Sequence, residues 1–417
     1  MQKTQISIDS EIGALNAVMV HRPGREIENM TPASAAEVLY DDILNLQLAE
    51  REHDQLTGVL RRVADVYEFE DLLRDALADQ HMKGLLVDEL VKLYGCEELA
   101  QELKDTEDAA LAAQLFQGTP MRKDSLEKFL NPLRHAIPPL PNAFFTRDAV
   151  MAVNESVIIG SMAFKARFAE ALLLKAIFKY HDKIRSDGFY FDGTASTSEK
   201  ITIEGGDLLV LREDLIMIGH SERTTTRGID TLMRAIAEKG GVENFVVVEI
   251  PKSRATIHLD MIFTMVDRDR CVVFSPLITG MHKCRAFHVR YEQQRVKRIV
   301  EYPGVLEALR TQGLDLKPIP CGGDNELRQE REQWSSGANF FAMAPGHIIG
   351  FEHNQATAEE LAKSGFEIVS ADRLISEDLS LEPGQPTLVT MHGSELSRGG
   401  GGCRCMTMPL NRNPVDW

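Results

Sequence analysis

The chain contains 417 residues and carries 63 acidic and 46 basic side chains, which gives a formal net charge of −17. Its 43% hydrophobic and 26% charged residues are typical of a globular protein and exclude a disordered one. The acid excess argues against binding to nucleic acid, and no apolar run approaches the ~18 residues that a membrane span needs.

The six cysteines are few for a disulfide framework in a chain of this length. Residues 1–15 lack the basic stretch and apolar core of a signal peptide. We therefore expect a reduced, cytoplasmic protein. At roughly 150 residues per domain, the length allows one large fold or two to three domains.

The first part of the chain divides into a strand and a helical block. Residues 15–22 predict a strand, which ends at the turn signal of Pro23 and Gly24. From 34 to 131 the apolar residues recur at helical spacing, with a possible strand at 65–70. This segment predicts a helical bundle inserted into another fold.

After the prolines at 138–141 the chain is rich in strands, and one pattern recurs. Two strands joined by a polar turn are followed by a helix and a further strand, a ββαβ unit. Strand pairs are predicted at 149–161, 207–221, 261–276 and 339–354, helices at 163–180, 228–239 and 358–364, and single strands at 245–250 and 366–371. Thr357 and Glu360 predict a capping box at the last helix. Such recurrence favours radial or stacked repetition over a doubly wound sheet.

A cysteine that follows a glycine run is the first candidate for chemistry. Cys405 comes after the four glycines 399–402 and lies near Arg398 and Arg404, a setting that we expect to be electropositive, partly open and favourable to a thiolate. A buried structural cysteine is the alternative. Cys403 and Cys405 could also form half of a metal site, which the lack of further nearby ligands disfavours. No Lys-Ser or Lys-Thr follows the glycines, so a phosphate-binding loop is excluded.

Polar residues in apolar strands provide further candidates. His258 and Asp260 are two residues apart in a predicted strand, so we expect them to share one face, although a histidine satisfied within the core is the alternative. Glu204 occurs at a tight bend, and Asp148 ends the segment 141–148. Arg167 near a helix start and Arg223 in a turn are individually weak signals, since lone arginines are usually solvated.

Taken together, one thiol, one histidine, several carboxylates and two arginines suit chemistry on a guanidinium group. Two or three carboxylates can bind the planar cation through its fork of N–H donors. A thiolate can then attack the central carbon. The histidine can protonate the leaving nitrogen and afterwards activate water.

Eight short motifs, taken in order and with their spacings, resemble the arginine deiminase family of the guanidino-group-modifying superfamily. They are HRPG at 21–24, DD at 41–42, PNAFFTRD at 141–148, EGGD at 204–207, SERT at 221–224, HLDMIFTMVD at 258–267, REQW at 331–334 and RGGGGCRCMTMPLNR at 398–412. The resemblance implies a five-bladed α/β propeller of ββαβ units around a central active site. It assigns 1–33 and 132–417 to the catalytic domain and 34–131 to an inserted helical bundle.

The same resemblance implies a role for each catalytic candidate. Cys405 matches the nucleophile, His258 the general acid and base, and Glu204 the carboxylate partner of the histidine. Asp148 and Asp260 match the pair that binds the guanidinium group.

The resemblance also implies the substrate and the residues that select it. Asn142, Arg167 and Arg223 match the groups that hold the α-carboxylate of the amino acid. The implied reaction converts L-arginine and water to L-citrulline and ammonia without metal or organic cofactor, and we expect a homo-oligomer that binds neither nucleic acid nor membrane. Gly400 stands where the family usually has an arginine, and Arg398 does not align with that arginine. The alternatives are an amidinotransferase of the same superfamily and a non-catalytic arginine-binding protein.

Overall fold

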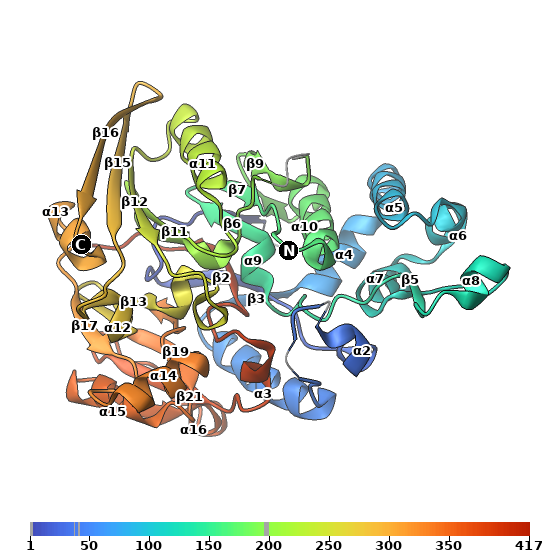
Figure 1. Ribbon diagram of the computed structural model, residues 1–417. Helices are drawn as coiled ribbons and strands as arrows, with labels where there is room; N and C mark the ends of the chain where they lie inside the picture. Colours follow the sequence, from blue (N-terminus) through green and yellow to red (C-terminus); the bar gives the residue numbers. More distant parts are fainter. Residues whose placement is uncertain (1–2, 37, 41, 196–199) are drawn as a thin grey trace.

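Apolar strands alternate with amphipathic helices along most of the chain, and the structure is accordingly an α/β fold (Figure 1). The computed structural model describes residues 3–36, 38–40, 42–195 and 200–417. Within these ranges it contains five sheets of three or more strands. In each sheet two strands pair antiparallel, and one of them also pairs in parallel with a third strand. The recurring unit predicted from the sequence is therefore confirmed as a pairing pattern.

Two of the sheets follow the predicted order of strand, strand, helix and strand. The elements of the first are β6 (Val150–Val153), β7 (Ser156–Ile159), α10 (Phe168–Tyr180) and β9 (Phe189–Asp192). Those of the second are β10 (Leu208–Arg212), β11 (Leu215–His220), α11 (Thr226–Glu238) and β12 (Asn244–Glu249), and its edge is extended by the hairpin of β15 (Ala286–Glu292) and β16 (Arg295–Tyr302). β6 and β7 are buried throughout, which explains their continuous apolar sequence.

The next two sheets contain longer connections. One consists of β13 (Phe263–Asp267), β14 (Arg270–Val273) and β17 (Lys317–Pro320), with α12 (Ser275–Ile278) and α13 (Val305–Thr311) between the last two strands. The other has the order β18 (Phe341–Ala344), β19 (His347–Phe351), β21 (Thr387–Met391) and β20 (Glu367–Ser370), with helices α14 (Glu326–Trp334), α15 (Gln355–Lys363) and α16 (Ala371–Ser376).

The capping box predicted at α15 is wrong. The helix begins two residues before Thr357, so this residue lies inside its first turn. The carboxylate of Glu332, from α14, accepts hydrogen bonds from the backbone N–H groups of Ala356 and Thr357, each at 2.8 Å, and from the Thr357 hydroxyl at 2.6 Å. A carboxylate from another helix thus satisfies the free donors at this helix start, which local sequence cannot reveal.

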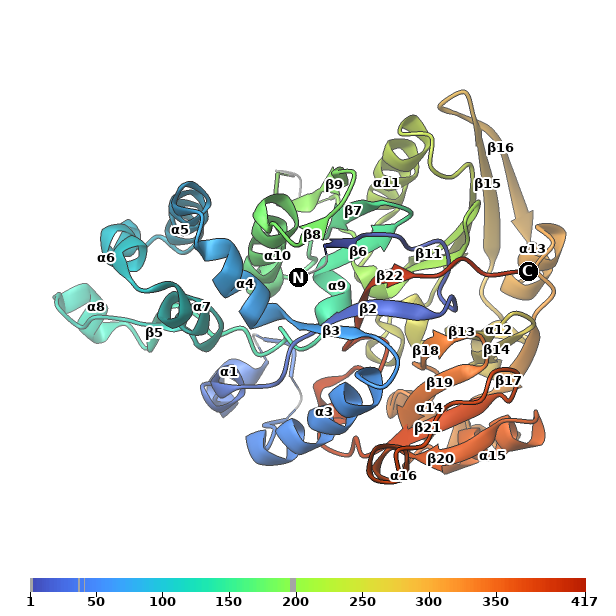
Figure 2. The same ribbon diagram turned by 180° about the vertical axis from the view of Figure 1, so that it is seen from behind.

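The fifth sheet joins distant parts of the chain. β2 (Leu15–Val20) pairs antiparallel with β22 (Met408–Arg412) and in parallel with β3 (Asp65–Glu68), as Figure 2 shows from behind. The strand predicted at 65–70 is thereby confirmed in a shorter form. Because β22 directly follows the segment that contains Cys405, this pairing fixes the thiol relative to the rest of the fold.

The predicted helical block is largely helical, and much of it projects from the sheets (Figure 1). Its helices are α2 (Pro32–Ala35), α3 (Leu46–Leu60), α4 (Phe69–Leu77), α5 (Gln80–Tyr94), α6 (Ala100–Asp105), α7 (Asp108–Gln117) and α8 (Leu126–Leu130). Helix α10 packs against α4 and α5, so it is apolar on the face toward the block as well as toward its own sheet. No helix in the described ranges is both long enough and apolar enough to cross a membrane.

Candidate active site

A cavity of about 250 Å³ opens at the ends of several sheets. Six of the eight site residues predicted from the sequence line it, namely Asn142, Asp148, Arg167, Arg223, His258 and Cys405. The other two, Glu204 and Asp260, are fully buried directly behind the lining and contact it through His258 and Cys405. Residues from six segments of the chain therefore meet at one site.

The loop before β22 places Cys405 at the wall of the cavity. The backbone N–H groups of Arg404 and Cys405 both donate to Oδ1 of Asn339, at 3.0 and 3.2 Å. Gly400 has a φ of +91°, a conformation that favours glycine, and a Cβ at Gly402 would lie 2.8 Å from the Asn339 side chain. The glycine run thus allows a turn that packs closely against Asn339 and aims the sulfur at Asp260, whose Oδ2 is 3.7 Å from Sγ.

The electropositive, partly open setting predicted for the thiol is wrong. Cys405 is only 4% exposed, and burial, followed by the charges of Asp260 and Asp148, raises its pKa well above the usual value. Arg404 is bound to Asp260 and to a second carboxylate, and Arg398 is paired with Asp42 and Glu395. The arginines beside the thiol are therefore largely neutralised, and the unliganded site favours the neutral thiol.

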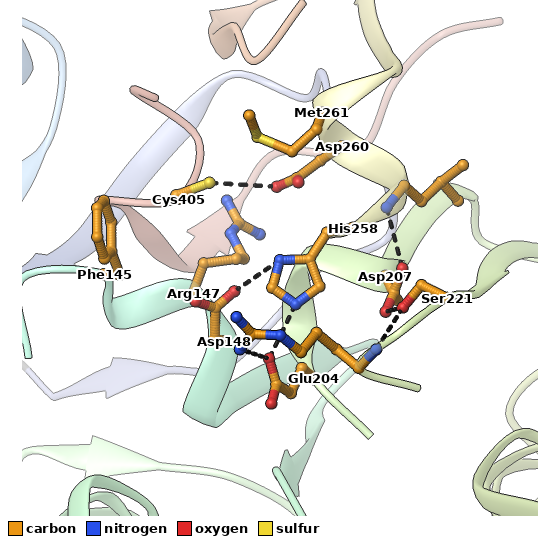
Figure 3. Close-up of polar contacts among 12 residues, drawn as sticks. Phe145, Arg147, Asp148, Glu204, Asp207, Ser221, His258, Asp260, Met261 and Cys405 are labelled. Atoms are coloured by element: carbon orange, nitrogen blue, oxygen red, sulfur yellow. Dashed lines mark hydrogen bonds and ion pairs between the residues drawn. The ribbon is translucent and has the colours of Figure 1, made fainter. Parts of the chain in front are cut away.

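The local structure around His258 also differs from the prediction. Residues 259–261 form a 3₁₀ turn, and His258 is the extended residue before it, so His258 and Asp260 do not share the face of a strand. Both side chains nevertheless reach the site, because the turn rotates Asp260 toward Cys405 (Figure 3). The strand predicted from 261 begins at residue 263.

His258 lies between two carboxylates (Figure 3). Its Nε2 is 2.9 Å from Oε2 of Glu204, and its Nδ1 is 3.7 Å from Oδ1 of Asp148. Burial opposes a charge on the ring, but Asp148, Glu204 and Asp207 together raise the pKa of His258 to about 9. The imidazole is therefore protonated at neutral pH and can act as an acid.

The carboxylates of Asp148 and Asp260 each have one oxygen without a hydrogen bond, and that of Asp148 keeps only the ion-pair contact of 3.7 Å with His258. Oδ2 of Asp148 accepts from Arg167 at 2.6 Å, and Oδ2 of Asp260 accepts from Arg404 at 2.8 Å. In both residues Oδ1 is buried without a hydrogen-bond partner. Unsatisfied buried carboxylate oxygens are costly, so this arrangement is suited to a ligand that supplies N–H donors.

The three residues expected at the α-carboxylate all line the cavity, but they differ in how many of their hydrogen-bond donors already have an acceptor. Arg167 donates to Asp148, to Glu170 and to the carbonyl oxygen of Phe145 at 3.1 Å. Arg223 donates to Glu204 at 3.3 Å, and its Nε is buried without a partner. Asn142 donates its amide to a backbone carbonyl at 2.8 Å. Arg223 is thus the member with an unused donor.

Sequence reasoning missed two carboxylates that organise the site. Glu170 binds Arg167 from three residues further along the chain, a spacing that could have revealed the pair. Glu11 binds Arg404 through both carboxylate oxygens, at 2.9 and 3.0 Å, across 393 positions, and no local pattern indicates that contact.

Of the predicted motif at 41–42, Asp42 lines the cavity and Asp41 lies outside the described residues. Within the described ranges, no group of three or more His, Cys, Asp or Glu side chains is arranged to hold a metal ion.

Comparisons with known proteins cover nearly the whole chain. The sequence model of the arginine deiminase family matches residues 36–412. The chain is 32% identical to arginine deiminase of Bacillus cereus (strain ATCC 10987 / NRS 248) over 444 residues, covering 99% of this chain and 100% of the relative. It is also 32% identical to that of Streptococcus gordonii over 436 residues, covering 100% of both.

Solved structures of low sequence identity share the fold. An amidinotransferase from Microseira wollei matches with a TM-score of 0.52 at 14% identity, covering 98% of each chain. At this identity the likeness concerns the fold alone. The family match and the full-length relatives decide the assignment: the chain belongs to the arginine deiminase family.

Proposed function

We propose that the protein hydrolyses L-arginine to L-citrulline and ammonia through a covalent intermediate on Cys405. The observation that carries the proposal is the pair of buried carboxylate oxygens without a hydrogen bond, on Asp148 and Asp260, in the site that holds the thiol and the protonated His258. A planar cation with N–H donors on both sides of its carbon satisfies both oxygens and exposes that carbon to the sulfur. The names of the relatives support the same substrate.

Binding of the substrate changes the charge balance at the thiol. The two carboxylates raise the pKa of Cys405, and a guanidinium cation between them offsets their charge. The thiol then releases its proton to solvent more readily, and the sulfur attacks Cζ of arginine. The new C–S bond forms as a C–N bond breaks, and the protonated His258 gives its proton to the leaving nitrogen, which departs as ammonia.

The second half of the reaction reverses the role of the histidine. After the first step His258 is neutral, and Glu204 keeps the ring oriented through the bond to Nε2. The imidazole takes a proton from water, whose oxygen attacks the amidino carbon. The C–S bond breaks, citrulline leaves, and the thiol and the imidazolium are restored.

The direct test of the proposal is product formation from arginine alone. We expect stoichiometric citrulline and ammonia from purified protein in a buffer without any acceptor amine. An amidinotransferase would release little ammonia until an amine such as glycine is added, and a non-catalytic arginine-binding protein would form neither product. Either of these two results would contradict the proposal.

The distal end of the substrate is assigned to Arg223, Asn142 and Arg167. Arg223 carries this role most directly, because its Nε has no partner, whereas Arg167 reaches the α-carboxylate only by releasing one of its present acceptors. A hydrogen bond to a charged group contributes about 1.5–3 kcal/mol. Loss of this contact therefore weakens arginine binding by roughly tenfold to a hundredfold.

We expect Arg223→Leu to raise KM for arginine by about tenfold to a hundredfold. Steady-state kinetics on arginine and on agmatine, which lacks the carboxylate, measure the effect. The ratio of kcat/KM for arginine to kcat/KM for agmatine should decrease in the variant. Equal turnover of agmatine and arginine by the parent enzyme would show that the carboxylate contact is wrongly assigned.

The pH dependence should report the protonated His258. Its pKa of about 9 lies above the ordinary value of ~6.5, so the acid form is present below pH 9 and is lost as the pH rises through that value. We expect kcat/KM for arginine to fall above about pH 9. In Glu204→Gln the ring loses an anionic partner, so the fall should begin at lower pH. If kcat/KM of this variant falls at the same pH as that of the parent, a group other than His258 controls the fall.

The finer architecture is also part of the proposal. We infer that the five sheets are the blades of a five-bladed α/β propeller, which their shared pairing pattern supports. Residues 1–33 and 132–417 then form the catalytic domain, and 34–131 form an inserted helical bundle that contributes β3 to one blade. Crystallographic determination of the blade order around the cavity tests this arrangement.

The proposal extends to assembly and location. A homo-oligomer is supported by apolar side chains that are more than half exposed on and after α8, namely Leu126, Phe129, Leu130 and Leu133. All six cysteines are free, which supports a reducing, cytoplasmic compartment. Sedimentation of the purified chain, with and without charged substitutions at Phe129 and Leu130, tests the first point.

A further inference from the structure

Asp207 is a fully buried acid that lies next to the active site without lining the cavity. Its two oxygens hold two different segments. Oδ1 accepts from the backbone N–H of Leu259, the residue after His258, at 2.9 Å, and Oδ2 accepts from the hydroxyl of Ser221 at 2.6 Å (Figure 3). Neither contact has a role in the mechanism described above.

Ser221 continues the connection toward the substrate-binding arginine. While its hydroxyl donates to Asp207, its oxygen accepts from the backbone N–H groups of Arg223 and Thr224, at 2.9 and 3.2 Å. The hydroxyl thus organises the turn from which the Arg223 side chain extends. Ser221 is only 1% exposed, so water does not replace these bonds.

The two carboxylates of the EGGD segment therefore make parallel connections between the same two partners. Glu204 binds the side chains of His258 and Arg223 through one oxygen, at 2.9 and 3.3 Å. Asp207, with Ser221, binds the backbone beside each of them. The side-chain connection leaves the distance between the two backbones free to vary, whereas the backbone connection fixes it.

The surrounding glycines show how closely this connection is packed. A Cβ at Gly206 would lie 2.5 Å from the ring of His258, and a Cβ at Gly219 would lie 2.3 Å from Oδ1 of Asp207. Both distances are too short for any side chain. The carboxylate and the imidazole are consequently held in place by direct backbone contact on one side.

We propose that Asp207 and Ser221 are positioning residues that fix the acid–base His258 and the substrate-binding Arg223 at a set separation. This inference rests on the proposed function of those two residues. It specifies how the chain matches the length of its substrate: proton transfer occurs at the guanidino end, and Arg223 holds the opposite end. Freedom of the Arg223 turn alone weakens the hold on the distal end of the substrate, whereas displacement of His258 misplaces the acid relative to the leaving nitrogen.

Substitutions of Ser221 and of Asp207 should have different effects, because the two residues act at different ends of the connection. Ser221→Ala leaves the Asp207–Leu259 bond intact and frees only the Arg223 turn. Asp207→Asn breaks the connection between the two ends, because its single oxygen can accept from Leu259 or from Ser221 but not from both, and its NH₂ group then points a donor at the other one. With the oxygen toward Leu259, the NH₂ group faces Ser221. The Ser221 oxygen already accepts two N–H groups, so its own proton is left without an acceptor.

The experiment compares kcat and KM for arginine in the parent, Ser221→Ala, Ser221→Thr and Asp207→Asn, with melting temperatures as a measure of folding. We expect Ser221→Ala to raise KM about tenfold with kcat within about twofold of the parent, because a single bond that positions a charged group is lost. Ser221→Thr keeps the hydroxyl and should restore KM. Asp207→Asn should lower kcat at least about tenfold in addition to raising KM.

Several outcomes would overturn the inference. One is a Ser221→Ala enzyme with unchanged KM; another is a loss of kcat in that variant as large as its change in KM. Failure of Ser221→Thr to restore KM in a folded protein would do the same. If Asp207→Asn does not fold, the two Ser221 variants still test the inference. If the parent itself forms no citrulline from arginine, the proposed function fails. If the parent is active but Ser221→Ala does not change KM more than kcat, only this inference is contradicted.

Discussion

Replacement of Cys405 by alanine is expected to abolish citrulline formation while arginine still binds. The side chain is small, and the backbone N–H groups that hold the loop donate to Asn339 independently of the sulfur. The carboxylates of Asp148 and Asp260 remain in place, so the cation is still bound. Loss of the nucleophile removes the covalent route, and turnover should fall by at least about four orders of magnitude. Calorimetric titration with arginine and a citrulline assay measure the two effects.

Cys403 is the matched control for this substitution. It lies in the same loop, is also fully buried, and has its sulfur 3.7 Å from that of Met391 rather than near a carboxylate. Cys403→Ala removes a thiol from the core without touching the cavity, so we expect turnover within a few fold of the parent and a moderately lower melting temperature. Residual turnover in Cys405→Ala within tenfold of the parent would refute the covalent role.

Asp260→Asn is expected to change turnover and thiol reactivity in opposite directions. The substitution preserves shape, and its oxygen can still accept from Arg404, which Glu11 also holds through two bonds. The charge that binds the guanidinium group is lost, so kcat/KM for arginine should fall by about 10²–10³. Burial and the Asp260 charge raise the pKa of Cys405, and the thiol should therefore ionise more readily in the variant.

The opposite signs distinguish an electrostatic effect from damage to the fold. The rate of alkylation by iodoacetamide at fixed pH reports the thiolate fraction. Cys403→Ala in the same background removes the other thiol of this loop, and peptide mapping of the alkylated protein follows Cys405 separately from the four remaining cysteines. We expect faster alkylation of Asp260→Asn than of the parent, together with weaker turnover. Slower alkylation, or turnover within tenfold of the parent, would contradict the role assigned to Asp260.

The repeated elements could be predicted from the sequence because their patterns are local. The strand pairs at 149–161, 207–221 and 339–354 show continuous apolar residues around a polar turn, and the structure places hairpins at each. The pairing of β2 with β22 could not be predicted, since nearly 400 positions separate the strands and only the first of them, at 15–22, is predicted as a strand. The fifth sheet could therefore be identified only in the structure.

The structure brings the predicted site residues together, but the local detail predicted around them is wrong. The convergence of Cys405, His258 and the carboxylates followed from residue types and motif order. The conformation around His258 did not, because a 3₁₀ turn in an apolar segment has the same hydrophobic pattern as a strand. The charge around the thiol was misjudged for a different reason: Arg404 is adjacent to Cys405 in sequence, but its guanidinium is bound by Glu11 from the opposite end of the chain.

The position of Cys405 between β21 and β22 has a consequence for the timing of biosynthesis. The thiol is held by a sheet whose strands come from residues 15–20 and 408–412, so the reactive centre cannot assemble until residue 412 has left the ribosome. Translation products that end before residue 405 contain Asp148 and Asp260, which we propose bind arginine, but lack the proposed nucleophile. By the proposed mechanism, chains still being synthesised therefore do not degrade free arginine, a building block that translation itself needs.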